Sequence, residues 1–261
     1  MTAPPAPPSS SAPTPSSSSS SPLPPPPAAD AGRPVVAEIV TIGDELVLGE
    51  TLDTNARDLA RLLRGIGVAV ARHTAIGDDV AAIAAAVREA AGRVPIVVTT
   101  GGLGPTFDDP TREAVARAAG VATAFDPALW ADVEAAFARF GRPPTDNNRV
   151  QARLPVGASA IRNPVGTAPG FWIDVAGACV VCLPGVPREM RYLAEHVVVP
   201  MLAARFGLTD RLWLRTLHVA GRGESAIDDR IADVAAGVPP GGPLAIGLAA
   251  HPGVVDIRLT A

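Results

Sequence analysis

The stretch PIVVTTGGLGPTFDDPT, residues 95–111, decides the fold class. Its opening run, Pro95–Thr100, is short, continuous and rich in β-branched residues, which is typical of a strand buried on both faces of a sheet. Glycines then break the run, Asp109 suits the N-cap of a helix, and Pro110 suits its first turn. A buried strand that leads through a glycine-rich loop into a helix indicates an open α/β sheet, in which ligands bind beyond the carboxyl ends of the strands.

Strands and helices alternate along the chain around this stretch. The sequence predicts strands at Val35–Ile42, Val68–Thr74 and Pro95–Thr100, and helices at Thr54–Arg64, Val80–Ala90 and Thr111–Ala119. Further along, it predicts helices at Pro127–Phe140 and Pro187–Leu202, and strands at Phe171–Val175 and Cys179–Leu183. This alternation implies parallel pairing with right-handed crossovers. We therefore expect an α/β fold with a mostly parallel sheet.

The two ends of the chain differ in character from this middle part. Residues 1–34 are mainly Pro, Ser and Ala and cannot bury enough surface to offset their ordering entropy, so a disordered tail is expected. From about Phe206 the pattern changes to a strand at Leu212–Val219, a helix at Glu224–Ala235, and strands at Leu244–Ala249 and Val254–Thr260. The predicted organisation is a tail at residues 1–34, an α/β domain at residues 35–205 and a small α+β domain at residues 206–261.

The composition excludes several classes of function. The 261 residues carry a formal net charge of −4, which gives no reason to expect a nucleic acid as partner. All 22 Lys and Arg positions are Arg, which excludes mechanisms that need a lysine, such as a Schiff base. No stretch reaches the length of a membrane span, and the N-terminus lacks the order of a signal peptide. We therefore expect a cytoplasmic protein without a membrane partner.

Cys179 and Cys182 form a C-x-x-C pattern, which is compatible with a redox or zinc site. In a strand, however, positions three apart point to opposite faces, and no second Cys or His pair accompanies them. We expect both to be small buried apolar residues.

Acidic residues follow the first predicted strand. Asp44 and Glu45 come directly after it, and at this edge of the sheet they would face a ligand crevice. Asp53 and Thr54 allow two interpretations, a ligand contact or a cap of the next helix, and the sequence does not separate them.

The glycine-rich loop combines features of an anion site and a metal site. Its glycines permit positive φ and a close approach of the backbone to a ligand, and its N–H groups would bind a phosphate. The consecutive acids Asp108 and Asp109 would repel that phosphate unless a cation intervenes. The pair therefore indicates Mg²⁺ or a similar hard metal.

Two further loops, at residues 163–170 and 183–190, are rich in Gly and Pro and are expected beside the first two clusters. Arg188 suits either a phosphate contact or a solvated position in the first helical turn. The amides of residues 147–151 offer contacts to the edge of a base or a pterin.

Together these motifs resemble the N-terminal half of the competence/damage-inducible protein A (CinA) family. The motifs are T-I-G-D-E-L…G…D-T-N from Thr41, T-G-G-L-G-P-T-x-D-D-x-T-x-E-A from Thr100, N-N-R-x-Q-A from Asn147, G-T-A-P-G from Gly166 and L-P-G-V-P-x-E-M from Leu183. The resemblance implies a three-layer α/β/α domain of the MoaB/Mog molybdopterin-binding type, followed by a small KH-like domain. It also implies an ADP-ribose pyrophosphatase supported by a divalent metal, and a homo-oligomer.

The resemblance and the residue chemistry together assign the candidate site residues. The expected catalytic residues are Asp108, Asp109 and Glu45, and the expected ligands of a divalent metal (Mg²⁺, Mn²⁺ or Co²⁺) are Asp44, Asp108 and Asp109. The expected substrate-binding residues are Gly43, Asn55, Gly101, Gly102, Gly104, Thr106, Asn148, Gly166, Thr167, Gly170, Pro184, Gly185 and Glu189.

The chain departs from the family pattern at Phe107, where the family usually has Lys. The related molybdenum-cofactor proteins have Arg at the position of Asp108, so the acid here favours the metal-assisted class. The sequence contains no counterpart of the amidase domain of longer members, so we do not predict deamidation. The GXXG clamp of an RNA-binding KH module is not evident either.

Three hypotheses follow. The first is metal-dependent hydrolysis of a pyrophosphate in an ADP-ribose-type nucleotide. The second is molybdopterin binding or adenylylation in molybdenum cofactor assembly. The third, motivated by Phe107, is a non-catalytic scaffold.

Overall fold

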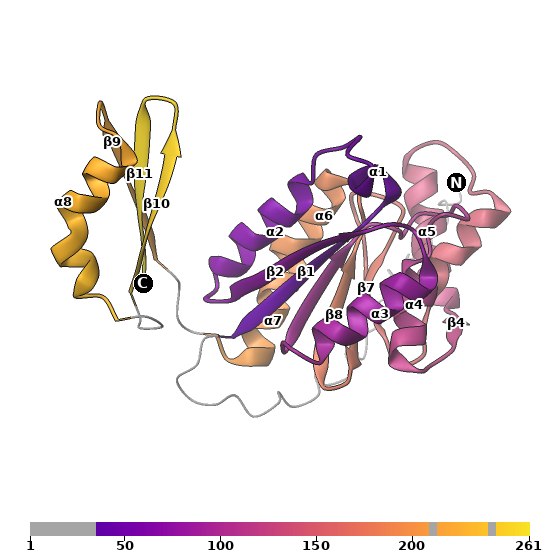
Figure 1. Cartoon of the computed structure of the whole chain (residues 1–261). Helices are drawn as coiled ribbons and strands as arrows, with labels where there is room; N and C mark the ends of the chain where they lie inside the picture. The colour runs from indigo at the N-terminus through magenta and orange to yellow at the C-terminus, as the bar shows by residue number, and fades with distance from the viewer. Residues whose placement is uncertain (1–34, 209–212, 240–243) are drawn as a thin grey trace, which may run out of the picture.

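The computed structural model describes residues 35–208, 213–239 and 244–261. The tail predicted at residues 1–34 lies outside these ranges. The core is a six-stranded sheet in the order β2-β1-β3-β8-β7-β6 (Figure 1). Its strands are β1 (Val36–Ile42), β2 (Ala69–Ile76), β3 (Ile96–Thr100), β6 (Ser159–Ile161), β7 (Gly170–Val175) and β8 (Ala178–Leu183). β2, β1, β3 and β8 pair in parallel, whereas β7 and β6 are antiparallel additions at one edge. The α/β class and the mostly parallel sheet are confirmed.

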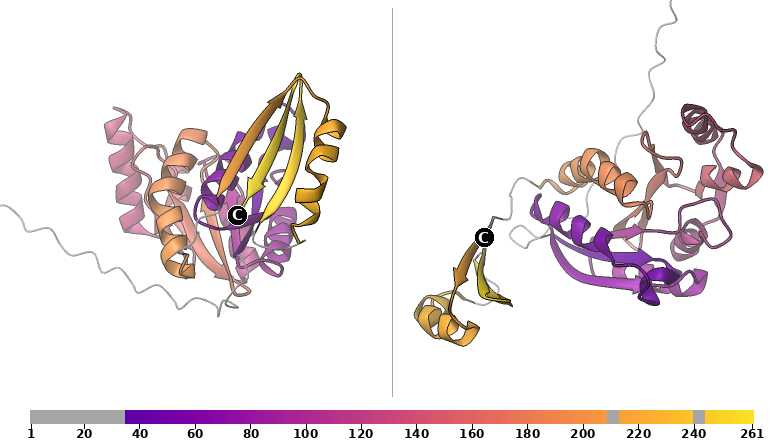
Figure 2. Two further views of the ribbon diagram at one scale, coloured as in Figure 1. Left: turned by 90° about the vertical axis from the view of Figure 1, so that its left-hand side faces the viewer. Right: turned by 90° about the horizontal axis from the view of Figure 1, so that it is seen from above.

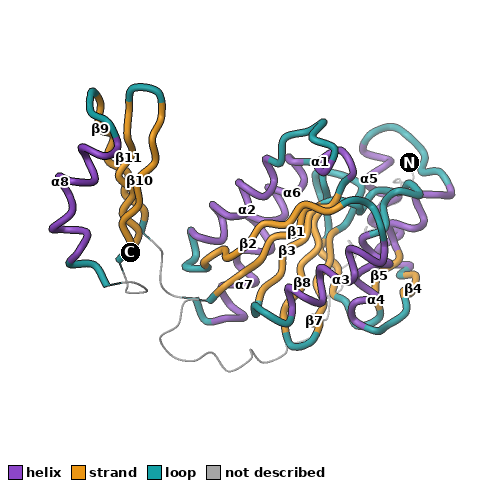
Figure 3. The backbone as a smooth tube through the Cα atoms, viewed as in Figure 1, coloured by secondary structure: helices purple, strands orange, loops and turns teal. Residues whose placement is uncertain are grey.

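Helices cover both faces of this sheet, which makes three layers (Figures 1 and 3). One core cluster joins the sheet to α3 (Val80–Ala91), α4 (Thr111–Ala119) and α5 (Pro127–Arg139). The other joins it to α2 (Thr54–Arg64), α6 (Pro187–Leu193) and α7 (Val199–Phe206). Cys182 belongs to the first cluster and Cys179 to the second, so the two thiols lie on opposite faces. Both are free, and burial raises the pKa of each to about 12, as expected for buried apolar residues.

Aspartates start three of these helices. Asp53 accepts a hydrogen bond from the N–H of Ala56 at α2, and Asp79 caps α3 in the same way. Asp126 accepts bonds from two N–H groups at α5. These bonds satisfy N–H groups that a helix leaves without partners in its first turn. Of the two interpretations given for Asp53, the cap is present in the structure.

The helix predicted at Pro187–Leu202 is present and continues to Phe206, but it contains a π turn. The π turn (η2, Ala194–Val198) separates α6 from α7, which starts at Val199. Pro200 explains the π turn, because it has no N–H to donate and its ring crowds the preceding turn. Five other short elements were not predicted: α1 (Asp44–Val47), η1 (Asp146–Ala152), strand β6, and the two-stranded sheet of β4 (Thr123–Phe125) and β5 (Arg153–Pro155). They are too short for a reliable periodicity.

The C-terminal unit is a three-stranded antiparallel sheet with one helix packed along it (Figure 2, left). It consists of β9 (Leu214–Ala220), α8 (Glu224–Ala236), β10 (Ala245–His251) and β11 (Val254–Thr260), with β11 in the middle. This agrees with the predicted α+β unit, although the start of its first predicted strand, Leu212, lies outside the described residues. No helix in the described ranges combines the length and apolar character needed to cross a bilayer.

Candidate functional site

A cavity of about 430 Å³ lies at the carboxyl ends of β1, β3 and β8. Twelve of the predicted site residues line it, namely Gly43, Glu45, Gly101, Gly102, Gly104, Thr106, Asp108, Asp109, Thr167, Pro184, Gly185 and Glu189. Five others, Asp44, Asn55, Asn148, Gly166 and Gly170, are not among its lining residues. Seven residues outside the predicted set also line it, namely Ile42, Asp78, Leu103, Pro105, Gln151, Ala168 and Val186.

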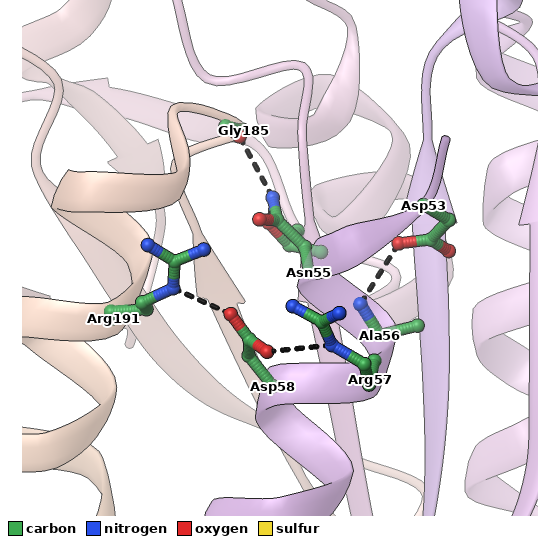
Figure 4. Close-up of polar contacts among 8 residues, drawn as sticks. Asp53, Asn55, Ala56, Arg57, Asp58, Gly185 and Arg191 are labelled. Atoms are coloured by element: carbon green, nitrogen blue, oxygen red, sulfur yellow. Dashed lines mark hydrogen bonds and ion pairs between the residues drawn. The ribbon is translucent and has the colours of Figure 1, made fainter. Parts of the chain in front are cut away.

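A second cavity of about 300 Å³ adjoins the first and contains Asn55 in its wall. The Asn55 amide donates to the carbonyl of Gly185 (2.7 Å, Figure 4) and to the hydroxyl of Thr100 (3.2 Å). The Thr100 hydroxyl in turn donates to the carbonyl of Pro184 (2.8 Å). Asn55 therefore ties the loop after β8 to the end of β3, and its position explains the D-T-N motif at the start of α2.

Thr111 orients two N–H groups of the glycine-rich loop, those of Gly102 and Leu103, and both residues line the main cavity. The Thr111 hydroxyl donates to the carbonyl of Gly101 (2.8 Å), and the Thr111 N–H donates to the carbonyl of Gly102 (3.2 Å). In a trans peptide the next N–H points away from the carbonyl, so the N–H groups of Gly102 and Leu103 face away from Thr111. Within the described residues neither N–H has a hydrogen-bond acceptor. These two donors are free to bind an anion.

Asp109 occupies the other N–H groups of the loop. One carboxylate oxygen accepts from the N–H of Gly104 (2.8 Å), and the other accepts from the N–H (2.9 Å) and the hydroxyl (2.5 Å) of Thr106. The N–H groups of Gly104 and Thr106 are therefore used inside the loop. These two N–H groups are not free for a ligand, in contrast to those of Gly102 and Leu103.

Arg112 also supports the loop, although it was not among the residues predicted from the sequence. Its guanidinium is buried and donates to the carbonyls of Leu103 and Gly104. Burial lowers the pKa of Arg112 to about 10, and the charge of nearby Asp109 opposes that shift. Arg112 shares the buried face of α4 with Val115 and Ala116. That helical spacing, three and four residues apart, was the available signal.

The glycines of the loop serve its own packing. Gly101 and Gly102 have φ values of 109° and 62°, which favour glycine. A Cβ on Gly101 would meet the carbonyl of Ile42, and one on Gly102 would meet the Thr111 hydroxyl. Glycine is therefore required at these two positions by close contacts with other parts of the protein.

The acidic residues that line the cavity differ from the predicted ones, because Asp78 lines it and Asp44 does not. Asp44 and Asp78 each accept a hydrogen bond from the backbone N–H of the other (3.0 Å both), which staples the loop after β1 to the loop after β2. Burial raises the pKa of Asp78, and the negative charges of Asp44, Glu45 and Asp108 add to that rise. Glu45, Asp78 and Asp108 line the cavity, whereas Asp44 is outside it. The signal for Asp78 was its place directly after a parallel strand.

These carboxylates do not form a complete metal cage. In the described part of the chain, no three His, Cys, Asp or Glu side chains are grouped so that they could hold a metal ion. Mg²⁺, however, is commonly held by one or two carboxylates together with substrate phosphates. Glu45 and Asp108 fit that incomplete donor set, because both line the cavity that also contains the free N–H pair.

Glu189 anchors another wall of the cavity. Its carboxylate accepts from the amide of Asn163 (2.6 Å), which also donates to the carbonyl of Ala168 (2.9 Å). A Cβ on Gly166 would collide with the Glu189 carboxylate. Burial raises the pKa of Glu189. Glu189 therefore holds the loop at residues 163–170 in place, and Gly166 is needed for that contact.

Phe107 is fully exposed and does not line the cavity. A side chain at this position therefore faces solvent, which locates the departure from the family pattern at the rim.

Comparisons with known proteins identify both parts of the chain. A family model described as a probable molybdopterin binding domain matches residues 38–204, and one described as the damage-inducible protein CinA KH domain matches residues 214–261. A CinA-like protein of Gemmatimonas aurantiaca is 47% identical over 226 residues, which cover 85% of this chain and 52% of that protein. A putative competence-damage inducible protein of Symbiobacterium thermophilum is 45% identical over 204 residues, 77% of this chain and 48% of that protein. The chain thus spans about half the length of the curated relatives it matches.

Among solved structures, the protein CinA of Thermoplasma acidophilum, described as of unknown function, matches with a TM-score of 0.59 and 36% identity. The match covers 64% of this chain and 98% of that one. The chain therefore belongs to the CinA family, with a MoaB/Mog-type domain followed by a CinA KH domain.

Proposed function

We propose that this protein hydrolyses the pyrophosphate of an ADP-ribose-type nucleotide with the support of a divalent metal. The observation that carries the proposal is the pairing of free N–H groups at Gly102 and Leu103 with carboxylates at Glu45 and Asp108 in one cavity. N–H groups bind phosphate oxygens, whereas carboxylates beside a phosphate need a cation between them.

The roles of the residues follow from their contacts. The N–H groups of Gly102 and Leu103 bind a phosphoryl oxygen and stabilise the charge that develops on it. Glu45 and Asp108 would hold Mg²⁺, Mn²⁺ or Co²⁺, which supplies positive charge against the phosphate oxygens. Asp109 positions the loop through Gly104 and Thr106. We therefore assign it a positioning role in place of the catalytic and metal-binding roles expected from the sequence.

Asp108→Asn and Glu45→Gln test the proposal. Each keeps the size of the side chain but removes its charge, so AMP release from ADP-ribose should fall about 100-fold or more with each metal. Asp229→Asn, an exposed position on α8, is the matched control and should be unaffected. Unchanged turnover in both site variants would refute the assignment.

Molybdopterin binding without hydrolysis is the second candidate, favoured by the family model that covers residues 38–204. Calorimetry with ADP-ribose and with molybdopterin separates the two. Tight binding of the pterin without AMP release from ADP-ribose would establish the second candidate. A scaffold predicts no rise in melting temperature with any nucleotide or pterin.

A further inference from the structure

We propose that the second cavity binds the terminal sugar of the nucleotide, and that Asp53 accepts a hydrogen bond from a hydroxyl of that sugar. The inference rests on the proposed nucleotide site but not on hydrolysis. It makes the two interpretations of Asp53 compatible, because one carboxylate oxygen caps α2 and the other is left for the ligand.

The two cavities are parts of one site. Five residues line both of them, namely Ile42, Glu45, Gly101, Gly185 and Val186. Gly101 directly precedes Gly102, whose N–H is free to bind an anion. A ligand whose phosphate binds at this N–H therefore has the second cavity beside it. The group that enters the second cavity is the one joined to that phosphate.

The polarity of the second cavity differs from that of the main one. Asp53 lines it together with two residues that carry hydroxyls, Thr51 and Thr54. The free N–H groups of Gly102 and Leu103 belong to the main cavity alone. A carboxylate repels a phosphate but accepts hydrogen bonds from hydroxyl donors. The phosphates therefore stay in the main cavity, and the second cavity takes a neutral group that donates hydrogen bonds.

Asp53 has one carboxylate oxygen to spare for such a group. Its first oxygen accepts from the N–H of Ala56 (2.8 Å), and Figure 4 shows the second oxygen pointing away from this bond. Within the described residues the second oxygen has no hydrogen-bond partner, and it remains accessible to solvent. In dinucleotide-binding folds an acidic side chain likewise accepts a hydrogen bond from a ribose hydroxyl.

The size of the cavities indicates which sugar is bound. An ADP-ribose-type nucleotide has a sugar next to each phosphate, with the base attached to only one of them. The second cavity measures about 300 Å³ and the main cavity about 430 Å³, so the smaller one receives the end without the base. One hydroxyl of this ribose donates to Asp53, and its neighbour has the hydroxyls of Thr51 and Thr54 as partners, which both donate and accept.

Two substitutions remove the free oxygen while they keep the cap. Asp53→Asn replaces it by a nitrogen that donates and does not accept, and Asp53→Ser removes it altogether. Both side chains retain an oxygen that caps a helix well, so both variants should melt close to wild type. Asp79→Asn is the matched control, because Asp79 caps α3 through the N–H of Ala82 (2.7 Å) and lines neither cavity.

Calorimetry with ADP-ribose and with ADP, both in the presence of Mg²⁺, measures the effect. ADP keeps the adenosine and both phosphates but lacks the terminal ribose. We expect the affinity for ADP-ribose to fall about tenfold in Asp53→Asn and in Asp53→Ser, and the affinity for ADP to stay unchanged. Neither affinity should change in Asp79→Asn. A role of Asp53 in capping alone predicts no selective loss in any of these variants.

The outcomes distinguish this inference from the proposed function. Equal losses for ADP-ribose and ADP, or no loss for either, overturn the sugar subsite even where AMP is released from ADP-ribose. A selective loss for ADP-ribose without AMP release supports the subsite and overturns hydrolysis. Failure of wild-type protein to bind either nucleotide overturns both.

Discussion

At the scale of single residues, the site depends on side chains that shape the glycine-rich loop from within. Thr111 turns two carbonyls inward, Asp109 takes up two N–H groups, and Arg112 takes up two carbonyls. Because these partners fix the loop before any ligand arrives, the N–H groups of Gly102 and Leu103 are preorganised for an anion.

Thr111→Val tests this organisation. The variant keeps the shape of the side chain but leaves the buried carbonyl of Gly101 without its 2.8 Å donor. We expect a loss of about 1–3 kcal/mol in the free energy of unfolding and a weaker nucleotide affinity, because the N–H of Gly102 loses its fixed direction. Urea unfolding and calorimetry measure the two effects. Thr111→Ser keeps the hydroxyl and should behave like wild type. Equal losses in the Ser and Val variants would show that the hydroxyl bond to Gly101 does not hold the loop.

Glu189 gives a prediction about pH. Burial raises the pKa of Glu189 in the folded state, so the folded protein favours the protonated form. Its contribution to stability is therefore greatest at low pH and falls as the pH rises through the ordinary glutamate range to the raised folded value. Glu189→Gln removes that titration, so its melting temperature relative to wild type should be higher at about pH 8 than at about pH 4. A difference independent of pH would show that the carboxyl is not perturbed.

At the scale of elements, α2 is bonded to two segments that follow β8: the loop at Gly185 and helix α6. Asp53 starts the helix, Asn55 holds Gly185, and Asp58 accepts a bond from Arg191 of α6 (2.5 Å, Figure 4). The hydrogen bond from Arg191 lowers the pKa of Asp58. The first turn of α2 is thus the part of the fold that positions the second cavity.

Asp53→Ala removes the cap of α2. The N–H of Ala56 loses its 2.8 Å acceptor, and we expect a cost of about 1 kcal/mol in the free energy of unfolding. Asp53→Asn keeps an acceptor oxygen and should cost much less. Thermal or urea unfolding of the three proteins is the measurement, and a cost in Asn equal to that in Ala would show that charge rather than capping matters.

At the scale of the whole molecule, an ion pair between buried Glu38 and partly exposed Arg93 joins β1 to the turn before β3. Glu38 is almost fully buried and accepts two hydrogen bonds from Arg93 (2.8 Å each). These bonds lower the pKa of Glu38, so the pair stabilises the fold above the ordinary glutamate pKa and the stabilisation is lost as the pH falls through the lowered one.

Arg93→Met leaves the Glu38 carboxylate buried without its partner. We expect a loss of about 1–3 kcal/mol in the free energy of unfolding at neutral pH, towards the lower end because Arg93 itself is partly exposed. The difference from wild type should shrink at acid pH, below the ordinary glutamate range, because the Glu38 carboxyl becomes protonated as the pH falls through its lowered pKa. Urea unfolding at both pH values tests this, with Arg88→Met, on the helix before it, as the control for a lost surface arginine. A constant difference would contradict the assignment to Glu38.

The sequence by itself determined the fold class and the place of the site. Hydrophobic periodicity is a local property, so it defined α2 and α4 to the residue and predicted the burial of Cys179 and Cys182 on opposite faces. The position of the loops at the carboxyl ends of parallel strands followed from the alternation of strands and helices.

Only the tertiary structure decided which polar groups remain free for a ligand. Asn55 and Gly185 are 130 positions apart in the chain, and Asp44 and Asp78 are 34 apart, yet each pair is joined by a hydrogen bond. A motif shows which donors and acceptors exist, but their partners depend on proximity in the fold. That is why Asp44, Asp109 and Asn148 turned out to bond other protein groups, while the N–H groups of Gly102 and Leu103 remained without partners in the described residues.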